Sequence, residues 1–125
     1  MNGYFDSGRP TLEFEIKGLK TDRIKATIDT GYDGYLSIPL AKALPLGLIL
    51  IATKTYTLAD GNSTHNLVCM GDVKLTKYKG QFIPIDLSFT SNSILVGCAF
   101  FKVFKVKVHI DYSNEKVRII NSKSK

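Results

Sequence analysis

The sequence predicts an all-β protein, built mainly of strands with one or two short helices that close into a barrel-like fold. Apolar and polar residues alternate over several short segments, which is the period of a half-buried strand. Turn residues separate these segments, and Asp60-Gly61 between strand-forming residues is a strong hairpin signal. The composition, 44% hydrophobic and 10% aromatic, is that of a folded chain.

The predicted elements follow from this alternation. Leu12, Phe14 and Ile16 fall on one face of the first strand, and charged residues fall on the other. A brief helix is expected at 39–44, with proline in its first turn. The segment 98–104 is too short and too apolar to distinguish a helix from a strand. The predicted strands are 11–17, 23–28, 35–38, 55–58, 64–76, 81–89, 93–97, 106–111 and 116–120.

Length and charge indicate one domain without a dedicated nucleic-acid surface. A chain of 125 residues suits a single domain, with an N-terminal arm at 1–10 and a basic tail at 121–125. The net charge is +6 and the pI about 9.3. Most lysines stand singly between apolar residues, which is typical of the solvated face of a strand. We therefore expect no nucleic-acid partner, although the charge favours acidic partners in general.

The cysteines and the apolar segments favour a soluble, cytoplasmic protein. Cys69 and Cys98 form no CxxC pair and are expected to be free thiols in a reducing compartment. Residues 1–6 lack the basic and apolar regions of a secretion signal. The longest apolar stretch, 44–52, is interrupted by proline and glycine and is far shorter than the roughly 20 residues of a membrane span.

One motif carries the chemistry. Asp29-Thr30-Gly31 follows an apolar strand, so a carboxylate stands at a strand end beside a glycine that permits a sharp turn. Two further features come later in the chain. They are a long hairpin with a small, polar tip at 59–63, and an apolar run at 94–97 that ends in glycine.

The ordered trio of motif, hairpin and apolar-glycine run resembles the retropepsin-like aspartic proteases over nearly the whole chain. The resemblance is nearest to small microbial members whose loop continues as Asp-Thr-Gly-aromatic-x-Gly, here 29–34. It implies that Asp29 is the catalytic acid and base. It also implies that Thr30 hydrogen bonds across a dimer axis and that Gly31 leaves room for backbone amides near the carboxylates.

The chemistry of such a site requires two carboxylates. Two carboxylates about 3 Å apart cannot both ionise, so they share one proton. The ionised group activates a water for attack on a peptide carbonyl, and the protonated group donates to the developing oxyanion. One chain supplies one loop, so the resemblance implies a homodimer with Asp29 from each copy and with neither metal nor cofactor.

The resemblance also assigns residues that meet a peptide or protein substrate. The hairpin tip, with Ala59, Asp60, Gly61 and Asn62, is expected to act as a flap over the bound peptide. Tyr32 is also expected to line the substrate site. It is bulky where retroviral members have alanine or serine, so we expect it to narrow that site.

Simpler interpretations of the same residues stay open. The tripeptide at 29–31 is compatible with a plain strand-ending turn. The related Asp-Ser-Gly at 6–8 is expected to be a loop leading into the first strand. Asp29 and Asp33 have no histidine or cysteine cluster to complete a metal site.

Two other functions are compatible with the sequence. One is a non-catalytic dimeric module that keeps the protease fold and binds peptides or proteins. The other is a small basic β-barrel that binds single-stranded nucleic acid through its tyrosines.

Overall fold

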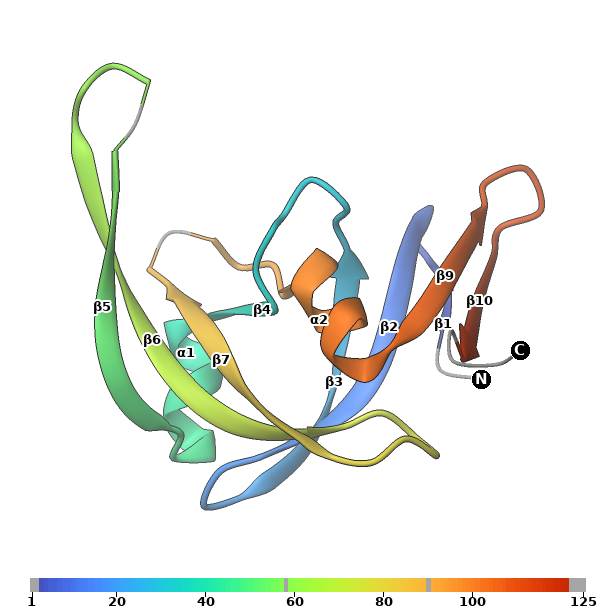
Figure 1. Ribbon diagram of the computed structural model, residues 1–125, viewed down its shortest axis with the longest axis horizontal. Coiled ribbons are helices and arrows are strands. Elements are labelled where there is room, and N and C mark those ends of the chain that lie inside the picture. Colours follow the sequence, from blue (N-terminus) through green and yellow to red (C-terminus); the bar gives the residue numbers. More distant parts are fainter. Residues whose placement is uncertain (1–2, 58, 90, 122–125) are drawn as a thin grey trace.

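The computed structural model describes residues 3–57, 59–89 and 91–121. Strands account for 54% of the chain and helices for 13%, which confirms the predicted all-β class. The elements, shown in Figure 1, run in the order β1 (Gly3–Asp6), β2 (Arg9–Lys17), β3 (Thr21–Ile28), β4 (Leu36–Pro39), α1 (Leu40–Ala43), a 3-10 helix η1 (Leu44–Leu46), β5 (Ile49–Thr57), β6 (Ser63–Lys74), β7 (Gln81–Ser88), β8 (Leu95–Val96), α2 (Cys98–Phe104), β9 (Val106–Asp111) and β10 (Lys116–Asn121).

The strands form a ring-like sheet. Eight of them follow the order β1-β2-β3-β8-β4-β7-β6-β5, and an additional pairing of β2 with β6 joins the two ends of the inner six strands. Three residue pairs make that junction, from Glu15–Lys74 to Lys17–Asp72. Among the described residues β1 and β5 each pair with one strand only, so the sheet has two edges that a fully closed barrel lacks. The last two strands, β9 and β10, were predicted at 106–111 and 116–120, and they form a separate two-stranded sheet.

The N-terminal arm expected at 1–10 contains a strand. β1 pairs antiparallel with the start of β2, and Ser7 and Gly8 make the turn between them. Both turn residues have positive φ, 54° and 79°, which matches the twist of a two-residue hairpin. The Asp-Ser-Gly motif at 6–8 is therefore a hairpin turn, not a loop that leads into the first strand. At the other end of the chain β10 extends to Asn121, and 122–125 lie outside the described residues.

The two short helices differ from the sequence-based expectations in detail. Pro39 was expected inside the first turn of α1, but its ψ of 142° is extended and it caps the helix from the end of β4. The ambiguous segment at 98–104 is a helix, α2. Phe100 and Phe104 explain this outcome, because residues four apart share one helix face and both of these side chains are buried.

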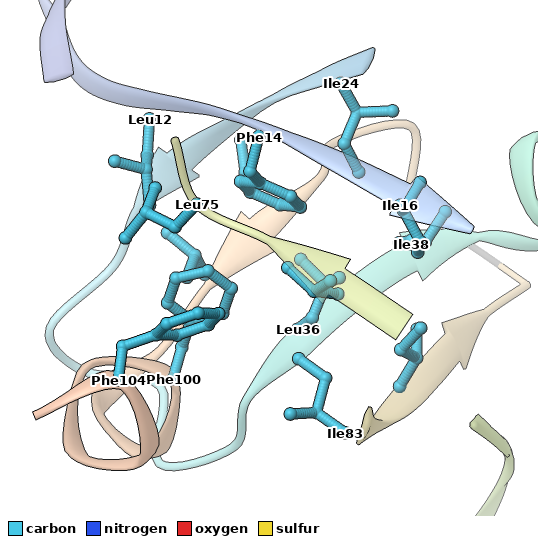
Figure 2. Close-up of a cluster of buried hydrophobic side chains, with 14 of the residues drawn as sticks. Leu12, Phe14, Ile16, Ile24, Leu36, Ile38, Leu75, Ile83, Phe100 and Phe104 are labelled. Carbon is cyan, nitrogen blue, oxygen red and sulfur yellow. The ribbon is translucent and has the colours of Figure 1, made fainter. Parts of the chain in front are cut away.

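The core fills the space between the inner faces of the sheet and α2. Leu12, Phe14 and Ile16, the alternating residues of β2, are fully buried. Figure 2 shows these side chains in one cluster with those of Leu36 and Phe100, which come from elements far away in the sequence. Burial of each such side chain contributes about 1.5–3 kcal/mol, so the alternation read from the sequence is the main source of the fold's stability.

Aromatic packing fixes α2 against the sheet. The ring of Phe100 lies 5.2 Å from that of Phe14 on β2 and 4.8 Å from that of Phe104 on its own helix, measured between centroids. Aromatic pairs at such distances add about 0.5–1.5 kcal/mol beyond area burial. α2 is consequently a rigid support for the residues that precede it, Gly97 and the end of β8.

Candidate active site

Asp29 stands where β3 leaves the sheet. β3 pairs in parallel with β8, Thr27 opposite Leu95 and Ile28 opposite Val96. The amide of Asp29 continues this ladder and donates to the carbonyl of Val96 at 3.0 Å. Its backbone position is therefore set by two strands that lie about 70 residues apart in the sequence.

The loop 29–35, which we call the Asp29 loop, turns sharply after the carboxylate. The amide of Gly31 donates to Asp29 Oδ1 at 3.0 Å, and the amide of Tyr32 donates to the Asp29 carbonyl at 3.1 Å. The first bond fixes the orientation of the Asp29 side chain, and the second closes the backbone turn; Asp29 itself is half-buried. Thr30 and Gly31 are exposed, so this turn faces outward from the molecule.

The start of α2 holds the other half of the Asp29 loop. The amides of Gly97, Cys98 and Ala99 donate in turn to the carbonyls of three loop residues, Tyr35 at 3.1 Å, Tyr32 at 2.9 Å and Gly34 at 3.2 Å. This approach is so close that a Cβ at Gly97 would lie 2.4 Å from the Gly34 oxygen. The glycine that ends the apolar run is therefore required by packing between two backbones.

Cys98 adds a side-chain contact to the same junction. Its Sγ lies 3.3 Å from the carbonyl oxygen of Thr30, to which the thiol donates. From the sequence, Cys98 was expected only to be a free thiol. The position of this cysteine directly after the glycine was the available signal, because that is where the second backbone meets the Asp29 loop.

Tyr32 is tied to a residue that sequence reasoning missed. Its hydroxyl donates to Asp86 Oδ2 at 2.5 Å, across 54 positions of sequence. Asp86 is only 7% exposed although its side chain is a carboxyl group, and it lies within β7. A lone aspartate between Ile85 and Leu87 was the signal that could have identified it. Charged residues in the middle of an apolar strand need a partner.

The hairpin of β5 and β6 carries the four tip residues at its far end. Ala59, Asp60, Gly61 and Asn62 are all exposed. Asp60 accepts two hydrogen bonds at 3.0 Å from the amide and the side chain of Asn62, and Gly61 supplies a positive φ of 90°. Leu58 lies outside the described residues. The expected turn at Asp60-Gly61 is thus present.

The tip and the Asp29 loop are not in contact in this single chain. In Figure 1 the hairpin rises at the upper left, and the loop between β3 and β4 stands along the same upper edge, separated from it. The structure therefore brings Asp29, Thr30, Gly31 and Tyr32 together, and it places the four tip residues apart from them on the same side of the molecule.

A shallow depression of about 300 Å³ adjoins the end of β3. It is lined by Thr27, two residues before Asp29, and by the side chains of Arg9, Lys25 and Asp6. Within the described part of the chain, neither Arg9 nor Lys25 forms an ion pair. The residues that line this depression therefore carry one more positive than negative charge.

Comparisons with known proteins assign no family to this arrangement. No protein-family model matches the chain, and no curated protein matches it in sequence. Within the described residues, no three His, Cys, Asp or Glu side chains gather closely enough to hold a metal ion. The helices of the described residues are also too short to cross a membrane.

Proposed function

We propose that this protein is an aspartic endopeptidase of the retropepsin type, in which two copies of the chain each contribute Asp29. The observation that carries the proposal is the geometry of the Asp29 loop. A carboxylate at a strand end accepts a hydrogen bond from the amide of Gly31 at 3.0 Å. Carbonyls of the same loop accept hydrogen bonds from the amides of Gly97 and of the two residues after it. This arrangement presents a fixed carboxylate at an outward-facing turn, as a shared site requires.

A second copy supplies the second carboxylate. A two-fold contact places the same residue of both chains on the axis, so one loop per chain is sufficient. The exposure of Thr30 and Gly31 supports this arrangement, because these residues are available to meet their equivalents. Two carboxylates held about 3 Å apart share one proton, so one acts as a base and the other as an acid.

Hydrolysis then proceeds with the groups of the two chains alone. The ionised Asp29 takes a proton from a water held between the carboxylates, and that water attacks the peptide carbonyl. The protonated Asp29 donates to the oxygen that becomes negative. The β5–β6 hairpin, with Asp60 and Gly61 at its tip, covers the peptide and excludes bulk water.

Replacing Asp29 by asparagine tests the proposal. A quenched-fluorescent peptide library is incubated at mildly acidic pH, with acidic sequences included because Arg9 and Lys25 lie near the end of β3. Asp29→Asn replaces the ionisable carboxyl group in both copies and is expected to reduce cleavage about a hundred- to ten-thousandfold without changing the far-UV circular dichroism spectrum. Asp33→Asn, an exposed aspartate of the same loop, is the matched control and should retain cleavage.

Mixing the two forms tests the dimer. If subunits exchange at random, an equal mixture of wild type and Asp29→Asn contains about one quarter wild-type dimers and shows about one quarter of the activity of wild type at the same total concentration. One half of the wild-type activity would instead indicate that each chain is active on its own. Peptide binding without any cleavage by the wild type would contradict the enzyme assignment and favour the binding module.

A further inference from the structure

The hydrogen bond between Tyr32 and Asp86 reaches from the Asp29 loop to a different part of the sheet. The hydroxyl of Tyr32 donates to Asp86 Oδ2 at 2.5 Å, and Asp86 is 7% exposed. Tyr32 itself is half-buried. The contact is therefore a feature of the interior, where a hydrogen bond to a charged group is strong and directional.

Asp86 belongs to the part of the sheet that carries the β5–β6 hairpin. It pairs with Ser37 of β4 on one side and with Val68 of β6 on the other. β6 is the returning strand of that hairpin. The hydroxyl of Tyr32 thus connects the Asp29 loop to the strand next to the base of the hairpin.

The backbone of Tyr32 is held from the opposite side. Its carbonyl accepts the amide of Cys98 at 2.9 Å, and its amide donates to the carbonyl of Asp29 at 3.1 Å. Its ring occupies the space that two glycines leave. A Cβ at Gly34 would lie 2.5 Å from the Tyr32 hydroxyl, and one at Gly97 would lie 2.6 Å from Cδ2. The backbone and the ring of Tyr32 are therefore both held in place within the Asp29 loop.

Packing alone does not require this pair. A phenylalanine ring would fill the same space between the glycines, and an apolar residue on β7 would avoid the desolvation of a buried carboxylate. The hydroxyl and the carboxylate add direction, because a hydrogen bond fixes both a distance and an angle. That property matters where a reacting group must be held to within a fraction of an ångström.

We propose that the Tyr32–Asp86 hydrogen bond is a positioning contact, which fixes the Asp29 loop relative to the strands that carry the β5–β6 hairpin. The inference rests on the proposed peptidase function for its consequence in catalysis. Neither residue is assigned a role in proton transfer. Their effect on the reaction passes through the placement of the Asp29 carboxylate.

The first test compares Tyr32→Phe with a matched control. Tyr32→Phe keeps the ring and removes only the donor, so the fold should persist. We expect kcat for peptide hydrolysis to fall about ten- to hundredfold while KM changes less than about twofold. Tyr78→Phe removes the hydroxyl of another half-buried tyrosine, which forms no side-chain hydrogen bond within the described residues, and should leave both constants unchanged.

The second test does not depend on hydrolysis. The thiol of Cys98 donates to Thr30 of the Asp29 loop at 3.3 Å, so its reactivity reports on that loop. Alkylation by iodoacetamide is followed by mass spectrometry of the two cysteine peptides. Tyr32→Phe should raise the rate at Cys98 at least a few-fold, and Cys69, which is 4% exposed, should stay slow as an internal control.

A double variant decides whether the two residues act as one contact. The variant that combines Tyr32→Phe with Asp86→Asn should have nearly the same kcat and the same rate of Cys98 alkylation as Tyr32→Phe alone. The reason is that Tyr32→Phe has already removed the hydrogen bond. Unchanged kcat or unchanged Cys98 labelling in Tyr32→Phe would overturn the inference. If the wild type cleaves no peptide, the proposed function fails, and the labelling result alone decides whether this hydrogen bond holds the loop.

Discussion

Replacing Gly97 by alanine probes the close approach on which the Asp29 loop depends. The φ of Gly97 is −111°, which any residue adopts, so the substitution adds a methyl group without backbone strain. An ideal Cβ there would lie 2.4 Å from the Gly34 oxygen and 2.5 Å from the Tyr32 oxygen. Real Cβ atoms essentially never approach another heavy atom within 3.0 Å, so the new Cβ and the Gly34 oxygen must separate by at least 0.6 Å, from 2.4 to 3.0 Å.

The size of the effect follows from that displacement. Forcing one extra carbon into a packed site costs roughly 1–3 kcal/mol, and here it also weakens the hydrogen bonds from Cys98 to Tyr32 and from Ala99 to Gly34. Domains of this size are stable by about 5–15 kcal/mol, so the variant should still fold. A displacement of this order in the Asp29 loop is expected to reduce peptide cleavage ten- to hundredfold.

Urea unfolding followed by far-UV circular dichroism measures the loss of stability, and the peptide assay measures the loss of activity. Gly80→Ala is the matched control. A Cβ there would lie 3.2 Å from the end of the Asp72 side chain, which can move, and at an ordinary 3.7 Å from the Val73 carbonyl oxygen. A Gly97→Ala variant whose free energy of unfolding lies within about 0.5 kcal/mol of the wild-type value, and which retains full cleavage, would contradict this expectation. The close approach would then not be what positions the loop.

Two further substitutions test the acid stability of the fold and the hairpin tip. Hydrogen bonds from Tyr4 and Arg23 hold the pKa of Glu13 below its usual 4.5. Because the folded pKa lies below the unfolded one, Glu13 stabilises the protein above about pH 4.5, and this contribution disappears as the pH falls through the folded value. Glu13→Gln should therefore flatten the loss of thermal stability below pH 4.5; equally steep acid unfolding in both proteins would contradict this. Asp60→Ala removes both hydrogen bonds to Asn62 at the hairpin tip and should raise KM several-fold with little change in melting temperature, whereas an unchanged KM would exclude a substrate contact of the tip.

The sequence determined the strands because their signal is local. Leu12, Phe14 and Ile16 alternate with charged residues, and all three are fully buried in the structure. The hairpin turn at Asp60-Gly61 also follows from two adjacent residues, since glycine supplies the positive φ. The position of Asp29 at the end of a strand was predicted in the same way, from the apolar segment before it and the glycine after it.

Errors arose where local signals compete or are weak. The segment 98–104 could not be assigned from its apolar character, because only packing against Phe14 selects the helix face with Phe100 and Phe104. Pro39 is compatible both with a helix start and with the end of a strand, and pairing of β4 with β7 decided in favour of the strand. The secondary structure of such segments depends on tertiary contacts, which cannot be predicted from the local sequence.

The amino-acid sequence by itself determined that a carboxylate, Asp29, would stand at the end of an apolar strand beside a turn. Only the tertiary structure decided what holds it there. The backbone of Gly97 packs against Gly34, and the hydroxyl of Tyr32 reaches Asp86 across 54 positions of sequence. The physical reason is that periodicity reports which face of a strand is buried, whereas a contact between two loops depends on how distant strands pair.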